Sequence, residues 1–324
     1  MTIVCDKHIP FLTEAVQKEW PHVRICPMES DEITHKTVRD ADVIIIRTRT
    51  QTDEQLLDGS NVRLVCTATI GFDHIDTAYC DSHHIRWMAC PGCNAQAVCD
   101  YIEEALEEIK DNGQWTIDNF VPTIGIVGVG HVGTLVAQMA ERNGMNVLLN
   151  DPPKGIGVSL DEIAKNCDVI TFHTPLSKDG DYPTFHLCDG MFLDKCKPDA
   201  LIINAARGGI VDEQALLQSG HPYVIDTWEN EPDINKDLLR HALLASMHIA
   251  GYSVEGKRNA TQMCLDAVAE QFGLKPIDIS QYNYTSQKKS NEPWLVAVTD
   301  ALKAHPNDFE ALRKAYPLRE ESVQ

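Results

Sequence analysis

The sequence is poor in positive charge. Its 324 residues include 28 Lys and Arg against 48 Asp and Glu, a formal net charge of −20, and no stretch rich in Lys or Arg offsets this locally. A chain of this kind repels nucleic acids and anionic membrane surfaces. We therefore expect neither as a partner, and an anionic small molecule would have to bind in a locally basic pocket.

The sequence also lacks long apolar runs. No run approaches the roughly 18 residues that a membrane-spanning helix needs. The N-terminus has no basic segment followed by an apolar one, as a secretory signal would have. The 11 cysteines are scattered along the chain, unlike the dense cysteines of small secreted domains. These features predict a cytoplasmic protein without a membrane segment.

Signatures of several other chemistries are missing as well. No serine stands in the Gly-x-Ser-x-Gly elbow of the α/β-hydrolases. Cys90 and Cys93 form a C-x-x-C pair, which could belong to a redox or zinc site. However, no second such pair and no histidine pair at metal-ligand spacing follows it. We therefore expect no metal site.

What the sequence does contain is strand-like apolar runs separated by helix-length segments, in two blocks. The first block has candidate strands at 2–5, 23–26, 43–46, 62–66 and 85–88. The second block has candidate strands at 123–127, 146–150, 169–172, 200–204, 223–226 and 246–249. Such alternation indicates parallel sheets covered by helices. The expected fold class is therefore α/β, with two doubly wound, Rossmann-like domains.

A glycine-rich turn lies at the start of the second block. Residues 128–133 have the sequence Gly-Val-Gly-His-Val-Gly, directly after the strand run 123–127 and before apolar residues at helical spacing. Such glycines allow a tight turn and close approach to a dinucleotide pyrophosphate at the helix N-terminus. Asp151, at the end of the next strand, would bind ribose hydroxyls and repel a 2′-phosphate. The pattern predicts NAD rather than NADP as cofactor.

Three polar residues follow later strand runs, where an open α/β sheet places its ligand contacts: Arg207, Glu231 and His248. Arginine binds a carboxylate with two hydrogen bonds. Histidine exchanges protons near neutral pH, and a neighbouring carboxylate fixes its tautomer. Each residue alone has an ordinary structural explanation. Together, on a dinucleotide-binding domain, they predict oxidation of a 2-hydroxy acid.

Over nearly its whole length the sequence resembles the D-2-hydroxyacid dehydrogenase family. Besides the residues above, the resemblance is carried by stretches 67–76, 91–95, 151–153, 171–176 with 178–180, and 248–252 with 255–257. It implies that Arg207 binds the substrate carboxylate, His248 accepts the hydroxyl proton and Glu231 supports His248. It also implies a cofactor site made of Gly128, Gly130, His131, Val132, Gly133, Asp151, Thr174, Ala205, Ala206, Arg207, Asp226 and Gly251.

The resemblance further implies a phosphorylated substrate, 4-phospho-D-erythronate, which would be oxidised at C2, and assembly as a homodimer. It places Thr48, Thr69 and Tyr252 at the substrate. Two alternatives stay open: another D-2-hydroxy acid such as 3-phosphoglycerate, or a non-catalytic protein that senses NAD(H).

The phosphate of such a substrate needs cations, because the chain as a whole is so acidic. Our own candidates for this role are Arg47, Lys257 and Arg258.

The expected domain division follows the two blocks. Residues 1–94 and a returning helix within 252–275 would form a substrate-binding domain, and residues 95–251 an NAD-binding domain. Residues 276–324 would form a small C-terminal segment, a shortened form of the family's dimerisation domain. The glutamates of the helix expected from residue 95 to 110 are interpreted as a solvated face.

Overall fold

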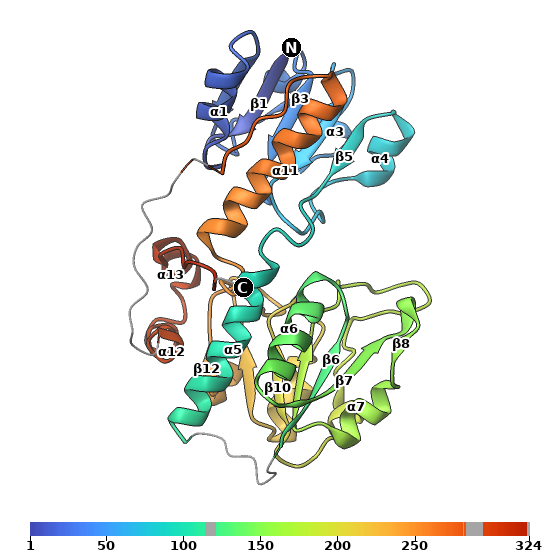
Figure 1. Ribbon diagram of the computed structural model, residues 1–324, viewed down its shortest axis with the longest axis vertical. Helices are drawn as coiled ribbons and strands as arrows, with labels where there is room; N and C mark the ends of the chain where they lie inside the picture. Colours follow the sequence, from blue (N-terminus) through green and yellow to red (C-terminus); the bar gives the residue numbers. More distant parts are fainter. Residues whose placement is uncertain (114–120, 281, 283–293, 323–324) are drawn as a thin grey trace. The chain divides into compact units, whose positions relative to one another are not determined.

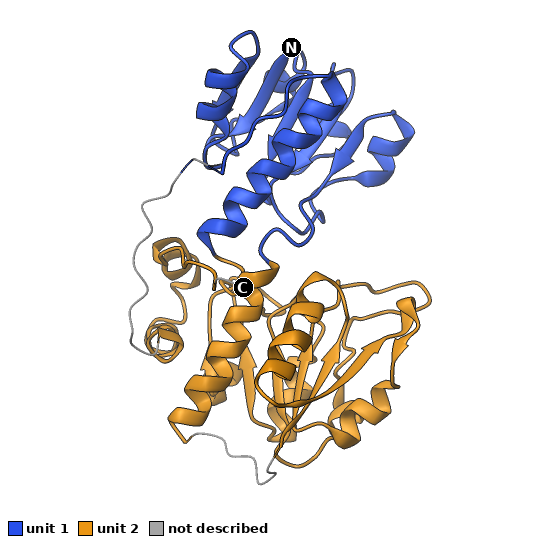
Figure 2. Cartoon of the chain, viewed as in Figure 1, with its two compact units in different colours: residues 1–94, 253–286 blue, residues 95–252, 287–324 orange. Residues whose placement is uncertain are grey.

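The computed structural model describes residues 1–113, 121–280, 282 and 294–322. The chain forms two compact units (Figure 2): Met1–Asn94 with Ser253–Ser286, and Ala95–Tyr252 with Gln287–Gln324. Nowhere in the described residues does a helix combine the length and the apolar character needed to cross a bilayer.

The first unit is built on a parallel sheet with the strand order β2-β1-β3-β4-β5 (Figure 1). Its strands are β1 (Thr2–Asp6), β2 (Arg24–Met28), β3 (Val43–Ile46), β4 (Leu64–Thr67) and β5 (Arg86–Met88). Helices α1 (Leu12–Glu19) and α11 (Val254–Phe272) pack on the face that carries Ile3 and Cys5. Helices α2 (His35–Val38), α3 (Glu54–Leu57) and α4 (Thr77–Ser82) cover the opposite face. Because both faces are covered, the inner strands are apolar throughout.

The second unit is built on a sheet with the strand order β12-β11-β10-β9-β6-β7-β8. Its strands are β6 (Thr123–Val127), β7 (Asn146–Asp151), β8 (Ile156–Gly157), β9 (Val169–Phe172), β10 (Leu201–Asn204), β11 (Tyr223–Ile225) and β12 (Leu244–Ala245). The strands pair in parallel except β8, which is antiparallel to β7. The sequence order reverses between β9 and β6, where doubly wound sheets bind nucleotides.

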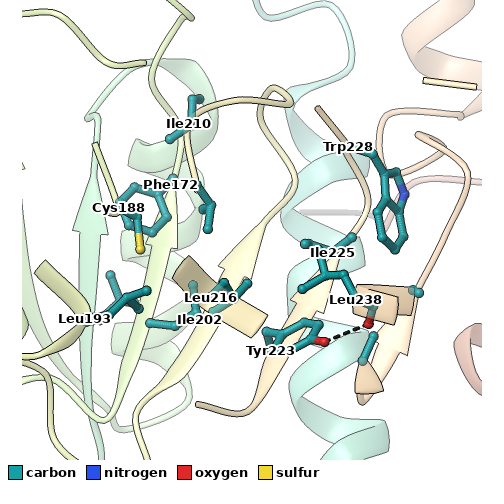
Figure 3. Close-up of a cluster of buried hydrophobic side chains, with 14 of the residues drawn as sticks. Phe172, Cys188, Leu193, Ile202, Ile210, Leu216, Tyr223, Ile225, Trp228 and Leu238 are labelled. Atoms are coloured by element: carbon teal, nitrogen blue, oxygen red, sulfur yellow. Dashed lines mark hydrogen bonds between the residues drawn. The ribbon is translucent and has the colours of Figure 1, made fainter. Parts of the chain in front are cut away.

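Helices cover both faces of this second sheet. Helices α5 (Ala95–Asp111) and α6 (His131–Arg142) lie on one face (Figure 1). The other face carries α7 (Leu160–Asn166), α8 (Gly190–Leu193), α9 (Glu213–Ser219) and α10 (Lys236–His241). The short helix η1 (Pro152–Lys154) directly follows β7. In that core, Phe172, Ile202 and Ile225 of three neighbouring strands pack together (Figure 3). Two further helices are α12 (Trp294–Ala304) and α13 (Phe309–Ala315).

The α/β class predicted from sequence is confirmed, and most strands lie within two residues of their predicted ends. Two differences concern the second sheet. The short edge strand β8 was not predicted. The last strand, expected at 246–249, is β12 and ends at Ala245. His248 lies beyond it with φ of 57°, a left-handed conformation that interrupts extended backbone.

The interpretation of the acidic face of α5 as solvated is wrong for Glu104 and Glu108, whereas Glu107 is exposed. Glu108 is only 8% exposed, and its carboxylate accepts the N–H groups of Leu295 and Val296 at the start of α12. Glu104 accepts a hydrogen bond from Trp294 Nε1. Carboxylates satisfy the unpaired N–H groups of a helix N-terminus. Two acidic residues of α5 therefore bind the start of α12, in the same compact unit.

Candidate active site

The glycine-rich turn joins β6 to α6 and leaves room for a ligand. Gly128 has φ of 92°, and a Cβ there would lie 2.7 Å from the carbonyl carbon of His173. A Cβ on Gly133 would lie 2.0 Å from Gly128 O, so helix and strand pack too closely for a side chain. A Cβ on Gly130 would meet nothing within 4 Å, and no side chain caps α6. The turn thus has the open backbone and uncapped helix N-terminus that a pyrophosphate requires.

Asp151, at the end of β7, is tied to this turn. Its Oδ2 accepts the N–H of Val129 at 2.9 Å, and Lys154 Nζ donates to Val129 O at 2.6 Å. Lys154 Nζ also lies 3.6 Å from Asp151 Oδ2. Among the described residues Asp151 Oδ1 has no partner, so one carboxylate oxygen remains for a ribose hydroxyl. Lys154 was missed in the sequence, although it follows Asp151 by only three positions.

Thr174 follows β9 and offers a second polar group beside the turn. Its Oγ1 is buried and has no hydrogen-bond partner in the described part of the chain. A Cβ on Gly128 would lie 2.9 Å from the Thr174 methyl group, which places the two residues in contact. Buried hydroxyls nearly always have a partner. Gly130, Asp151 and Thr174 therefore fit a dinucleotide cofactor, in agreement with the prediction.

Arg207 lies in a turn after β10 that Asn204 holds in place. Asn204 Nδ2 donates to Arg207 O at 2.9 Å, and its Oδ1 accepts the N–H of Ala206 at 3.2 Å. A Cβ on Gly208 would lie 1.8 Å from Trp228 O. The turn carrying Arg207 therefore packs against the segment after β11 that leads to Glu231.

Glu231 and His248 form a direct pair. His248 Nδ1 lies 2.9 Å from Glu231 Oε2 and 3.1 Å from Oε1, and the Trp228 N–H donates to Oε1 at 3.0 Å. Burial opposes ionisation of Glu231, but the hydrogen bond and charge of His248 outweigh it, and the pKa of Glu231 is lowered. With Nδ1 bonded to a carboxylate, Nε2 is the nitrogen that can accept a proton. The imidazole is 33% exposed.

The backbone next to His248 is held from inside by Asp226, at the end of β11. The Asp226 carboxylate accepts Ser246 Oγ–H at 2.6 Å and the N–H groups of Ile249 at 2.7 Å and Ala250 at 3.0 Å. Asp226 is 1% exposed. Because both oxygens have protein partners, the structure shows Asp226 orienting the segment that carries His248, and the expected contact with cofactor stays a prediction.

Tyr252 ends the same segment and meets the C-terminal helix. Its hydroxyl accepts a hydrogen bond from Arg313 Nε at 2.9 Å, and the Arg313 guanidinium carbon lies 5.5 Å from the centre of its ring. Arg319 N–H also donates to Tyr252 O at 3.4 Å. The sequence did not point to either arginine. No local pattern marks these two arginines, because their contacts with Tyr252 join residues 61 or more positions apart.

The other predicted substrate residues lie in the first unit. Thr48 is exposed just after β3. Thr69, after β4, has a hydroxyl bonded to Thr67 and to Gly71 O. Arg47 forms two hydrogen bonds with buried Asp6, Nε to Oδ2 at 2.9 Å and Nη2 to Oδ1 at 3.1 Å.

Lys257, on α11, lies within electrostatic reach of Arg47. Burial, and then the positive charge of Arg47, lowers the pKa of Lys257. Arg258, the third candidate for the phosphate, is half-buried on the same helix. Asp6 already pairs with Arg47 and offsets part of this positive charge.

One group of side chains in the described residues has metal-ligand composition: His186, Asp212 and Glu229. His186 Nε2 lies 3.1 Å from Glu229 Oε1, whereas its Nδ1 lies 3.5 Å from Asp212 Oδ2. The two nitrogens thus face different carboxylates, as in an ion-pair network. The C-x-x-C residues Cys90 and Cys93 are both buried, and neither forms a disulfide. The expectation of no metal site stays a prediction.

Comparisons with known proteins agree with this geometry. Residues 101–250 match the family described as D-isomer specific 2-hydroxyacid dehydrogenase, NAD binding domain. The erythronate-4-phosphate dehydrogenase of Bacteroides fragilis is 42% identical over 346 residues, covering 99% of this chain and 97% of that protein. That of Porphyromonas gingivalis is 39% identical, covering 98% and 92%.

Among solved structures, NAD+-bound 3-phosphoglycerate dehydrogenase of Entamoeba histolytica superposes with a TM-score of 0.70 at 22% identity, over 87% of this chain and 99% of that one. This likeness shows the fold. Fold and site together define an NAD-dependent dehydrogenase that acts on a CH–OH group. The chain belongs to the D-2-hydroxyacid dehydrogenase family, within its erythronate-4-phosphate dehydrogenases.

Proposed function

We propose that the protein oxidises 4-phospho-D-erythronate at C2 to the 2-oxo acid with NAD, as a step of pyridoxine biosynthesis. The observation that carries the proposal is the 2.9 Å pair of His248 Nδ1 and Glu231 Oε2 beside the turn that holds Arg207. Relatives named erythronate-4-phosphate dehydrogenase at 42% and 39% identity support the choice of substrate.

The roles of the three residues follow from their chemistry. Arg207 binds the substrate carboxylate and polarises the C2 oxygen, because a planar guanidinium matches a carboxylate with two hydrogen bonds. His248 accepts the C2 hydroxyl proton at Nε2. Glu231 keeps the proton of the neutral imidazole on Nδ1 and stabilises the imidazolium that forms. Bound NAD supplies the acceptor for the hydride that leaves C2.

The cofactor would be held at the carboxyl ends of the second sheet. Gly130 leaves space for the pyrophosphate at the start of α6, next to His131 and Val132, and Gly128 and Gly133 allow the close packing of the turn. Asp151 would bind the adenosine ribose through Oδ1. The remaining predicted cofactor residues are Thr174, Ala205, Ala206, Arg207, Asp226 and Gly251.

We assign substrate binding to the first unit and NAD binding to the second. Thr48, Thr69 and Tyr252 would contact the substrate. Arg47 and Lys257 would bind the 4-phosphate, since a phosphate needs cations in so acidic a chain. The protein would act in the cytoplasm as a homodimer, as its resemblance to the family implies.

The test is NADH formation with 4-phospho-D-erythronate, 3-phospho-D-glycerate and unphosphorylated D-erythronate, each at several concentrations. We expect kcat/KM to be highest for 4-phospho-D-erythronate. A higher kcat/KM for 3-phospho-D-glycerate would mean that the proposed substrate is wrong and that the proposed oxidation of a 2-hydroxy acid is right. Tight NADH binding without turnover of any hydroxy acid would favour an NAD(H) sensor instead.

A further inference from the structure

Arg319 forms hydrogen bonds with the backbone of the segment that carries His248. Its Nη2 donates to Ala250 O at 2.5 Å and to Ile249 O at 3.4 Å. We call residues 248–252 the catalytic loop and residues 309–319 the tail segment. The Arg319 side chain is only 10% exposed, so these hydrogen bonds form away from bulk water.

The second unit holds the Arg319 guanidinium from its other sides as well. Its carbon lies 4.5 Å from the centre of the Trp294 ring, and Nη1 lies 3.4 Å from Glu104 Oε2. Nη2 also reaches Ala97 O at 3.4 Å. A planar guanidinium can serve several acceptors and stack on an aromatic ring, which a lysine cannot do at once. Contacts with α5 and α12 thus fix the position of the Arg319 guanidinium next to the catalytic loop.

Arg313 acts at the far end of the loop. Its Nε donates to Tyr252 OH at 2.9 Å, and Nη1 lies 3.4 Å from Glu310 Oε1. Burial opposes the charge of Arg313, but Tyr252 and Glu231 favour it, and its pKa is raised. The same charge helps to lower the pKa of Glu231. Arg313 is therefore linked electrostatically to the carboxylate that supports His248.

The loop needs such support because of its conformation. His248 has φ of 57°, which is unfavourable for a residue with a side chain and persists only where the surroundings impose it. Asp226 binds the N–H groups of Ile249 and Ala250 from within the fold. The tail segment binds the opposite, carbonyl side of the same residues.

We propose that two arginines of the tail segment serve the active site: Arg319 anchors the catalytic loop, and Arg313 is a positioning residue that orients Tyr252 at the end of that loop. The proposal rests on the proposed function for the role of His248. It gives Arg313 and Arg319 a positioning role within one chain, apart from any part they have in assembly.

The first experiment compares full-length Arg313→Met, Arg313→Lys and Lys314→Met. Lys314 is an exposed cation on the same helix and serves as the matched control. We expect Arg313→Met to lower kcat/KM for 4-phospho-D-erythronate about tenfold to a hundredfold, with NADH affinity unchanged. The acid limb of its pH profile should move to higher pH, because Glu231 loses a neighbouring cation. Arg313→Lys should restore the limb partly, and Lys314→Met should match the wild type.

A double-mutant cycle with Tyr252→Phe separates the two routes by which Arg313 acts. If Arg313 works by orienting the phenol, the double variant should lose no more activity than Arg313→Met alone. A wild-type pH profile and kcat in Arg313→Met, at unchanged stability, would overturn the role of Arg313.

Hydrogen exchange of residues 246–253 tests the anchor without any turnover. Arg319→Lys retains the charge but cannot stack on Trp294 and contact Glu104 while it also binds the two carbonyl oxygens, so exchange in the loop should rise about tenfold while exchange in β6 stays constant. Unchanged exchange would overturn the anchor. If the wild type oxidises no hydroxy acid, the proposed function fails, whereas this measurement still decides whether the tail segment holds the loop.

Discussion

Asp226 and Arg319 bind opposite sides of the same two residues. The carboxylate of Asp226 accepts the N–H groups of Ile249 and Ala250, and the guanidinium of Arg319 donates to their carbonyl oxygens. One partner comes from the end of β11 and the other from the C-terminal segment. Between them the backbone after His248 has little freedom, so the imidazole is fixed against Glu231 before a substrate arrives. Such preorganisation lowers the barrier of the reaction.

Replacing Asp226 by Asn should weaken this arrangement. The amide nitrogen would face one backbone N–H group, which would stay buried without an acceptor. We expect a loss of about 2 kcal/mol in the free energy of unfolding and a lower kcat, measured by urea denaturation and by NADH formation. Asp194→Asn, on the surface, is the control. Equal stability of the two variants would contradict the importance of the Asp226 carboxylate.

His248→Gln should remove the base and leave the cofactor site intact. We expect kcat to fall on the order of 10²- to 10⁴-fold, with the NADH dissociation constant within about twofold of wild type by fluorescence titration. His22→Gln, on an exposed histidine of the first unit, should have no effect. A rate near that of the wild type in His248→Gln would mean that another group accepts the proton.

Asp151→Ala should reduce the preference for NAD over NADP. The variant loses the carboxylate that repels a 2′-phosphate, and Lys154 stays nearby to attract one. We expect the ratio of the two kcat/KM values to fall about tenfold or more. Asp161→Ala, whose side chain is mostly exposed, is the control. An unchanged ratio would show that Asp151 acts only by holding the Val129 N–H.

Lys257→Met should weaken binding of the substrate phosphate and leave binding of the rest of the substrate unchanged. We expect a KM for 4-phospho-D-erythronate that is about tenfold or more above wild type, and an unchanged KM for unphosphorylated D-erythronate. The lowered pKa of Lys257 implies that phosphate binding weakens at a lower alkaline pH than an ordinary lysine would allow. Lys36→Met, an exposed lysine of the same unit, is the control. Equal effects on both substrates would place the phosphate elsewhere.

Glu213 should make stability depend on pH. Burial raises the pKa of this carboxyl from 4.5 to about 7, and nearby acidic groups add to the shift. Between these values the unfolded chain has released a proton that the folded protein retains, so stability falls as the pH rises through this window. At pH 8 the free energy of unfolding of Glu213→Gln should exceed that of the wild type by about 1–3 kcal/mol. The variant should therefore also unfold at a higher temperature.

At pH 4.5 and below, Glu213→Gln and the wild type should be nearly equal in stability, because both side chains are then neutral. Glu141→Gln, on an exposed carboxyl, provides the reference for loss of one surface charge. A constant difference between Glu213→Gln and wild type at every pH would mean that the pKa of Glu213 is the same in the folded and the unfolded protein.

Much of the fold could be predicted because it follows from local periodicity. Apolar runs such as the four residues of β3 alternate with helical patterns, and a buried parallel strand needs no other signal. Arg207, Glu231 and His248 could be chosen because the carboxyl ends of neighbouring parallel strands lie at one edge of a sheet. The failure at 246–249 came from the same rule, since an apolar run does not reveal that His248 turns the backbone.

The sequence by itself therefore determined the α/β class, the glycine-rich turn and the residue types at the strand ends, because each depends on neighbours a few positions away. Only the tertiary structure decided that Glu104 and Glu108 accept hydrogen bonds from the start of α12 and that Arg319 binds the backbone after His248. These contacts join positions about 70 to 215 residues apart. Whether a charge is solvated or buried in such a contact depends on the packing of distant elements, which no local pattern of residues encodes.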